Sequence, residues 1–308
     1  MGGFMRIAIV GIGGVGGYIG AKFCALQTMQ PKASEVVFIA RGSHADAIRE
    51  QGIRVIEDKE RFTAHPTEVC SAEAAQGSFD LVLLCVKSYD IEDAVMSLAH
   101  ALRPDTVIIP FANGVDNARR VASLVDAKVL NGCVYILSHI AAPGVIRKEG
   151  NVFAASFGHP EYFGESLHVG YLFKDAGLRA KASEDIERDV WKKYLFISAF
   201  ATLTSCYNMS IRSVAETHAD VTRDVLNEIA AVAAAKGIDL SGEAEKAFAS
   251  ALKLPADAST SMHLDFKNRH RTELETLTGY VVAEAQRHAI DVPNMARMYT
   301  LLKENPYG

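Results

Sequence analysis

Apolar residues change their spacing along this chain, and the change divides it into two parts. In the first part, short apolar runs at 7–10, 35–40, 79–86 and 106–110 predict buried strands, with helical spacing between them. From about residue 183 the spacing is helical almost throughout, with helices expected at about 218–236, 241–253, 261–269, 273–289 and 294–303. The pattern predicts an α/β fold: a doubly wound parallel sheet over 5–182, then an all-helical domain over 183–308.

Two stretches of the first part have a different pattern. Residues 52–56 and 61–64 predict a hairpin with a charged turn at 57–60. Between 129 and 158, short extended pieces with a turn at Pro143-Gly144 predict added, partly antiparallel strands at the edge of the sheet.

Composition narrows the class of protein. A chain of 308 residues with 49% hydrophobic residues is typical of a globular protein with a large core, and its length suggests two domains. A net charge of −5 argues against a broad nucleic-acid surface. No apolar run is as long as a membrane span, and the start has no secretory core. Five scattered cysteines without C-x-x-C fit a reduced, cytoplasmic protein, and no metal-ligand spacing is visible.

A G-x-G-x-x-G motif follows the first predicted strand and precedes a helical pattern, which is the setting of a Rossmann-type dinucleotide site. The first glycine makes the tight turn, the second admits the pyrophosphate and the third lets the helix pack on the strand. The helix start then offers free N–H groups to the phosphates. The predicted cofactor-binding loop is Gly11, Ile12, Gly13, Gly14, Val15 and Gly16.

Arg41 follows the second predicted strand, where NAD-binding versions of this unit carry an acidic residue for the ribose 2′-hydroxyl. A planar guanidinium suits a 2′-phosphate, so the sequence favours NADP(H). The alternative is that Arg41 is a solvated surface charge. Lys87 and Asn113 follow two further strands and are candidates for the cofactor or substrate cleft, or plain loop residues.

Candidate chemistry in the helical half centres on Lys193. A lysine on a buried helix can act as a general acid, although it is more often a surface charge whose stem lies on apolar atoms. Ser261 and Asp265 are four residues apart and share a helix face. Thr272-x-x-Glu275 has the form of a capping box, which explains those two residues but leaves Glu273 without a structural reason.

At this point the whole chain, from Met5 almost to its end, resembles the ketopantoate reductase family. The resemblance depends on a set of motifs in order: the glycine loop, Lys87, Asn113-Gly114, Pro143-Gly144, Trp191-x-Lys193, Ser261-Met262-x-x-Asp265, and Thr272-Glu273 followed by Gly279.

The resemblance implies NADPH-dependent reduction of 2-dehydropantoate to pantoate, a step toward coenzyme A, at an active site between the two domains. It implies that Lys193 protonates the developing alkoxide and that Glu273 holds this lysine and the substrate hydroxyl. Asn113 would lie near the nicotinamide and the substrate, and Ser261 and Asp265 would belong to the substrate site. Lys87 and Arg41 would contact the cofactor. The implied partner is a small 2-keto acid, with a homodimer left open.

One departure from the family pattern concerns the substrate. The family usually has asparagines four and eight residues after the catalytic lysine, where this chain has Ile197 and Ala201. Either other polar groups replace them (Ser198, Thr202, Asn208 or His263), or the substrate differs. The alternatives are therefore a related 2-keto acid or opine-type dehydrogenase and, from another class, a non-catalytic NADP(H)-binding sensor.

Overall fold

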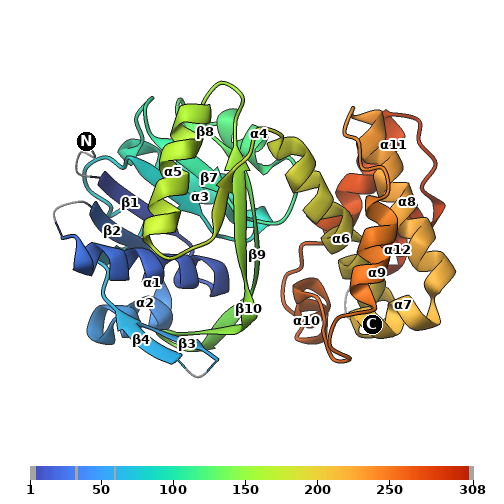
Figure 1. The fold of residues 1–308 in the computed structure, drawn as a ribbon, viewed down its shortest axis with the longest axis horizontal. Coiled ribbons are helices and arrows are strands. Elements are labelled where there is room, and N and C mark those ends of the chain that lie inside the picture. Colours follow the sequence, from blue (N-terminus) through green and yellow to red (C-terminus); the bar gives the residue numbers. More distant parts are fainter. Residues whose placement is uncertain (1–4, 32–33, 59, 305–308) are drawn as a thin grey trace. The chain divides into compact units, whose positions relative to one another are not determined.

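The structure is a computed structural model that describes residues 5–31, 34–58 and 60–304 (Figure 1). The chain forms two compact units. The first holds the chain up to Ala112 together with Asp116–Ile186, and the second holds Asn113–Val115 together with Glu187 onwards. The sequence places the boundary at 182/183, whereas the units divide at 186/187. The segment Asn113–Val115, which follows a strand of the first unit, groups with the second.

A six-stranded, fully parallel sheet forms the centre of the first unit. The apolar runs predict its four central strands, whereas the edge strand at 68–70 was not predicted. Successive side chains of a strand point to opposite faces of the sheet, so the apolar side chains of the four central strands enter two different cores. Ile7 and Ile9 belong to one core and Ala8 and Val10 to the other. The strand order is β5 (Glu68–Cys70), β2 (Ser34–Ile39), β1 (Met5–Val10), β6 (Leu81–Leu84), β7 (Val107–Pro110) and β8 (Lys128–Val129).

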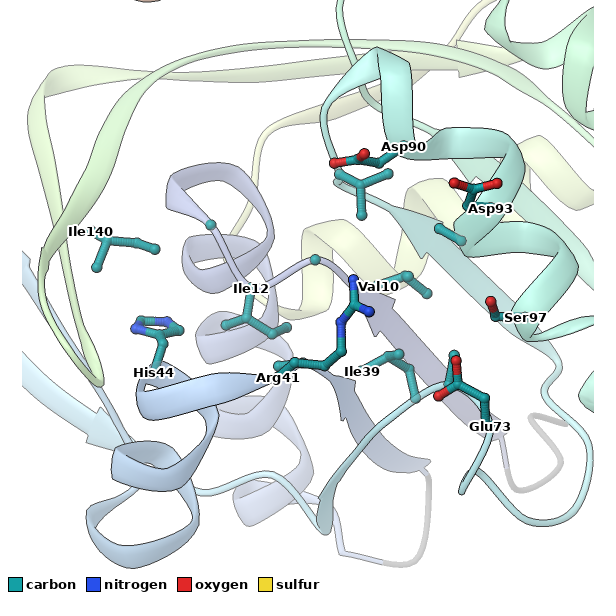
Figure 2. A pocket seen from close by; sticks show the side chains of 16 residues that line it. Val10, Ile12, Ile39, Arg41, His44, Glu73, Asp90, Asp93, Ser97 and Ile140 are labelled. Carbon is teal, nitrogen blue, oxygen red and sulfur yellow. The ribbon is translucent and has the colours of Figure 1, made fainter. Parts of the chain in front are cut away.

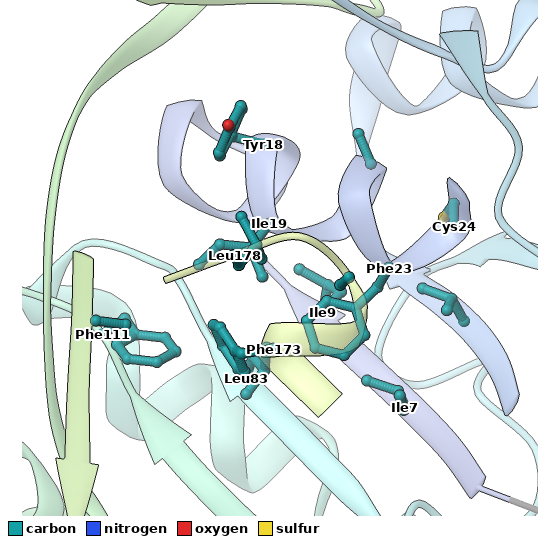
Figure 3. Close-up of a cluster of buried hydrophobic side chains, with 14 of the residues drawn as sticks. Ile7, Ile9, Tyr18, Ile19, Phe23, Cys24, Leu83, Phe111, Phe173 and Leu178 are labelled. Atoms are coloured by element: carbon teal, nitrogen blue, oxygen red, sulfur yellow. The ribbon is translucent and has the colours of Figure 1, made fainter. Parts of the chain in front are cut away.

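Helices cover both faces of this sheet. Residues of α1 (Gly14–Met29) and α5 (Phe163–Asp175) belong to one core, where Phe23 and Phe173 meet edge to face with ring centroids 5.2 Å apart (Figure 3). The other core contains residues of α3 (Ile91–Ser97) and α4 (Asn117–Ala122). The remaining helical elements are α2 (Gly42–Gln51) and the 3₁₀ turns η1 (Ser88–Asp90) and η2 (Ala99–Ala101).

A second, five-stranded sheet corrects the prediction for residues 129–158. Only β8 adds to the edge of the first sheet. The other pieces are two long antiparallel strands, β9 (Asn131–Ala142) and β10 (Val145–Gly158). They join the hairpin of β3 (Ile53–Glu57) and β4 (Glu60–Ala64) and the short β11 (Ala180–Ala182) in a separate sheet. Parallel pairing of β10 with β3, far apart in sequence, creates this sheet, and local periodicity carries no sign of it.

The second unit is helical, as predicted. Its elements are α6 (Ile186–Tyr207), α7 (Ile211–Thr217), α8 (Ala219–Ala235), α9 (Glu243–Ala251), α10 (Ser261–Lys267), the single π-helical turn η3 (Glu275–Gly279), α11 (Tyr280–Arg287) and α12 (Pro293–Glu304). The buried Glu228 carboxylate of α8 accepts hydrogen bonds from the Asn294 and Met295 amides at 2.9 and 2.8 Å. It thereby satisfies N–H groups in the first turn of α12.

Two kinds of feature are absent from the described part of the chain. No helix there is both long and apolar enough to cross a bilayer. No three His, Cys, Asp or Glu side chains gather there as a metal ion would require.

Alanine substitutions at Gly14 and Gly13 should differ in their effect on the free energy of unfolding. A Cβ on Gly14 would overlap the Ser138 carbonyl of β9, whereas a Cβ on Gly13 would meet no atom within 4 Å. We expect Gly14→Ala to lower the free energy of unfolding by roughly 1–3 kcal/mol, because backbone has to move. Gly13→Ala, which changes only a helix N-cap, should cost less than about 1 kcal/mol. Urea denaturation without cofactor measures both, and an equal loss in the two variants would contradict the Ser138 contact.

Candidate functional site

A pocket of about 440 Å³ lies beyond the carboxyl ends of β1 and β2 in the first unit (Figure 2). Parallel α/β sheets bind their ligands at this edge. The lining comes from the end of β1 and the glycine loop, the β2–α2 junction, the segments after β5 and β6, the helix α3 and one residue of β9. Its residues are Val10, Gly11, Ile12, Gly13, Ile39, Ala40, Arg41, His44, Ala72, Glu73, Val86, Asp90, Asp93, Ala94, Ser97 and Ile140.

The glycine loop divides into a half that lines the pocket and a half that begins α1. Gly11 has φ +86°, and a Cβ on it would lie 2.7 Å from Cγ1 of Val86. Gly13 stands just before α1 with open space where a Cβ would be. Gly14, Val15 and Gly16 form the first turn of α1 and are not part of the lining. The backbone can therefore approach a ligand at Gly13, next to the helix start.

Arg41 stands just before α2, two residues after the end of β2, and lines the pocket (Figure 2). The sequence analysis missed Glu73, which also lines the pocket. The pKa of the Glu73 carboxyl is lowered by hydrogen bonds from its own backbone N–H and from Ser71, with a smaller contribution from the Arg41 charge. An acidic side chain therefore shares this end of the pocket with Arg41, although it comes from a different loop.

His44 is a second residue that the sequence analysis did not single out. Its Nδ1 accepts a hydrogen bond from the Gly144 amide at 3.0 Å, which ties α2 to the turn between β9 and β10. Burial lowers the pKa of this imidazole, so the ring is neutral at neutral pH. With Nδ1 as acceptor, the proton of the neutral ring is on Nε2. In the sequence, His44 is visible only as the last residue of the Arg41-Gly42-Ser43-His44 stretch after the second predicted strand.

The two other candidates that follow strands, Lys87 and Asn113, lie in different units of the structure. Lys87 begins η1 and lies between Val86 and Asp90, which both line the pocket, but it is not itself part of the lining. Asn113 follows β7 and belongs to the second unit by its contacts.

Asn113 connects the two predicted catalytic residues. The Lys193 ammonium donates to Asn113 Oδ1 at 2.9 Å, and Asn113 Nδ2 donates to Glu273 Oε2 at 3.3 Å. The Glu273 side chain is buried, with 3% of its surface exposed. Because lysine only donates and an ionised carboxylate only accepts, these contacts fix which way the amide is turned. The three residues, 80 and 160 positions apart, form one hydrogen-bonded group within the second unit.

A ladder of hydrogen bonds from α6 holds the π-helical turn that follows Glu273. The Tyr194 hydroxyl lies 2.8 Å from the Thr276 carbonyl oxygen and 3.0 Å from that of Leu277. The Ser198 hydroxyl donates to the same Leu277 oxygen at 2.6 Å, and Thr202 Oγ1 lies 2.7 Å from Thr278 Oγ1. A π turn leaves backbone carbonyls without their usual helical partners, and these side chains supply donors. In the sequence, the spacing of four between Tyr194, Ser198 and Thr202 indicates three hydroxyl groups on one face of the helix.

The remaining predictions have mixed outcomes. Ser261 and Asp265 lie on α10, whose N-cap is Thr260. The described bonds from this helix run from Thr260 to Thr204 (2.9 Å) and from His263 to Asn208 (2.9 Å). The capping-box interpretation of Glu275 is wrong. Its Oε2 accepts from the Tyr299 hydroxyl of α12 at 2.7 Å, because the π turn aims this side chain at the neighbouring helix.

Because Tyr194 and Ser198 share the Leu277 carbonyl oxygen, substitutions at these two positions should be energetically coupled. Tyr194→Phe and Ser198→Ala should each cost about 1 kcal/mol of unfolding free energy, because the other hydroxyl still serves the carbonyl. The double variant should lose about 1 kcal/mol more than the sum, because a buried acceptor is then left without a partner. Chemical denaturation of the wild type, the two single variants and the double variant measures this coupling free energy. Tyr194→Phe combined with Thr204→Val, whose hydroxyl donates to Phe200 instead, should be additive. Additivity in both cycles would rule out the shared acceptor.

Comparison with known proteins identifies two family models. The model described as ketopantoate reductase PanE/ApbA matches residues 7–160, and that of the ketopantoate reductase PanE/ApbA C terminal matches residues 185–305.

Individual relatives agree with these models. An uncharacterized oxidoreductase, YkpB, of Bacillus subtilis is 27% identical over 97% of this chain and 98% of its own length. A 2-dehydropantoate 2-reductase of Archaeoglobus fulgidus is 28% identical over 93% and 92%. The crystal structure of 2-dehydropantoate 2-reductase from Porphyromonas gingivalis is 34% identical, covers 97% of this chain and 99% of that one, and superposes with a TM-score of 0.85. A D-mandelate dehydrogenase, 19% identical with a TM-score of 0.87, shares the fold. The chain belongs to the ketopantoate reductase family of oxidoreductases.

Proposed function

We propose that this protein reduces a branched 2-oxo acid to the 2-hydroxy acid with NADPH, with Lys193 as the general acid. The observation that carries the proposal is the Lys193–Asn113–Glu273 group. An ammonium aimed by a fixed amide is a suitable partner for an oxygen that gains negative charge. A protein that only sensed the nucleotide would have no use for this group.

The first unit fits a dinucleotide phosphate. Gly13 leaves open space just before a 16-residue helix whose first N–H groups favour anions. Arg41 lines the same pocket and can form paired hydrogen bonds with a 2′-phosphate. NADPH, when bound, supplies the hydride for the carbonyl carbon.

The residues of the second unit then act on the substrate oxygen. Lys193 stabilises the growing negative charge and transfers a proton to it. Asn113 accepts from the ammonium and so sets the direction in which its remaining protons point. Glu273, nearly removed from water, keeps the amide turned toward the lysine. Hydride transfer requires close contact of the nicotinamide and the carbonyl carbon, so both units are needed for turnover.

The identity of the acid has two candidates. The names of several relatives make 2-dehydropantoate, a precursor of pantoate on the way to coenzyme A, the first substrate to test. A related 2-oxo acid is the second candidate. It is favoured by Ile197 and Ala201, which follow Lys193 on α6 without a polar side chain.

Lys193→Ala tests the catalytic proposal. We expect kcat to fall by about 10²–10⁴-fold, because the developing alkoxide loses its proton donor, while NADPH affinity stays unchanged. NADPH oxidation by 2-dehydropantoate and by other branched 2-oxo acids measures turnover, and cofactor fluorescence measures affinity. Lys192→Ala is the matched control, because Lys192 forms an ion pair with Glu243 at 3.0 Å. Normal turnover of Lys193→Ala, or an equal loss in both variants, would refute the assignment.

Arg41→Ala tests the choice of cofactor. Loss of a charge-assisted contact to the 2′-phosphate should weaken NADPH binding about 10–100-fold and leave NADH binding nearly unchanged. Glu73→Gln removes the neighbouring negative charge and should not weaken NADPH. Titration of each protein with both nucleotides gives the comparison. The same loss for NADPH and NADH would show that Arg41 does not read the phosphate.

A further inference from the structure

The pocket beyond β1 and β2 has two different sides (Figure 2). On one side lie Ile140 and the His44 ring, whose Nδ1 is used by the Gly144 amide and whose Nε2 is buried. On the other side lie Asp93 and Ser97 of α3. In the part of the chain that the structure describes, neither the Asp93 carboxylate nor the Ser97 hydroxyl forms a hydrogen bond or an ion pair. The α3 side therefore offers a ligand open acceptors, and the His44 side does not.

Small apolar residues border the same side of the pocket. Asp93 and Ser97 are four residues apart and share one face of α3, and Ala94 lines the pocket beside them. Ala72, from the segment after β5, also belongs to the lining. Both alanines are partly buried and pack against the second core of the sheet. A flat aromatic ring can lie on such apolar walls while its edge reaches the polar groups.

The proposed cofactor contacts determine which part of NADPH reaches this side. The diphosphate lies at Gly13 and the 2′-phosphate at Arg41 in that proposal. The ribose carries its base on the carbon next to the 2′-phosphate, and the diphosphate is attached at the other end of the sugar. The base therefore lies beyond Arg41 as seen from Gly13, where the α3 side has apolar walls and open acceptors.

We infer that the α3 side of the pocket recognises adenine, with the Asp93 carboxylate accepting a hydrogen bond from the 6-amino group of the base. This inference rests on the proposed function and specifies how its cofactor is recognised. A carboxylate only accepts hydrogen bonds, so an amino group at this place gains a partner. A carbonyl oxygen at the same place would meet the negative charge with its own lone pairs. The pocket therefore prefers adenine to a 6-oxo purine such as hypoxanthine.

A purely structural role for Asp93 has a matched control. Carboxylates in the first turn of a helix are stabilised by its N–H groups, and Asp93 is in the first turn of α3. Glu92 is in the same turn, but it pairs with Arg120 at 3.1 Å and does not line the pocket. Glu73, from the loop across the pocket, accepts hydrogen bonds from Ser71 and from its own backbone N–H. Glu92→Gln thus removes a first-turn charge without touching the lining.

Two dinucleotides that differ only in the base test the inference: NADP⁺ and deamino-NADP⁺, in which hypoxanthine replaces adenine. Titration calorimetry at neutral pH measures the binding of each to the full chain. We expect the wild type to bind NADP⁺ about tenfold more tightly, the effect of one hydrogen bond to a charged group that is exposed to water. Asp93→Asn should reduce this preference to less than about twofold, because an amide both donates and accepts. Glu92→Gln should keep the wild-type preference.

The outcomes separate the inference from the proposed function. Equal binding of the two dinucleotides to the wild type, or a preference that Asp93→Asn keeps, overturns the inference. An equal loss of preference in Glu92→Gln also overturns it, because the helix start and not a base contact would then be responsible. Normal turnover of Lys193→Ala refutes the reductase assignment and leaves a measured base preference standing.

A different choice of dinucleotide by the protein also gives a decision. If NAD⁺ binds and NADP⁺ does not, NADPH is the wrong cofactor, and the same comparison with NAD⁺ and deamino-NAD⁺ decides the inference. Binding of none of the four dinucleotides overturns the inference and the proposed function together. Thermal unfolding shows whether each variant is folded.

Discussion

The two hydrogen bonds of the Asn113 amide are the contacts on which the candidate site depends. Lys193 only donates and Glu273, as a carboxylate, only accepts, so a neutral amide between them satisfies both at once. An aspartate at 113 would set two carboxylates against each other, and a leucine would leave the buried Glu273 without this donor. Asn113 comes three residues after the end of β7 and precedes Gly114, whose φ of +125° turns the chain. The hydrogen-bonded group is therefore built from the loop after β7, the long helix α6 and the segment just before the π turn.

The π turn shows how the second unit keeps Glu273 in position. In a regular helix starting at Leu274, the backbone carbonyls would accept from N–H groups of the same helix. The hydroxyl groups of α6 would then have no open carbonyl oxygen to bind. The extra residue of the turn exposes the Thr276 and Leu277 oxygens, and Tyr194 and Ser198 bind them from α6. The helix that carries Lys193 thus also fixes the segment that carries Glu273. A Cβ on Gly279 at the end of the turn would lie 2.8 Å from Glu275 Oε2 and 3.0 Å from the Tyr299 ring, so a larger residue there would displace the Glu275 side chain.

The sequence predicted those parts of the molecule whose signal is local. Gly11, Gly13 and Gly16 lie where strand, turn and helix require them, and the helices of the second unit follow from their periodicity. It did not predict the second sheet, because the pairing of β10 with β3 is a long-range contact. The helix α2 was missed because Ala45 and Ile48 are its only buried apolar residues, too few for a clear period. Glu73 was missed because a pocket residue from a distant loop has no spacing relative to Arg41.

Two rows of side chains run along α6 and have different partners. Lys193, Ile197 and Ala201 follow one another at intervals of four, and Tyr194, Ser198 and Thr202 form the next such row. The second row is fixed by its bonds to η3, so a change there would disturb Glu273. The first row carries Lys193, whose ammonium donates to Asn113. Because both rows belong to one helix, a shift of α6 would move the Lys193 ammonium and the segment after Glu273 together.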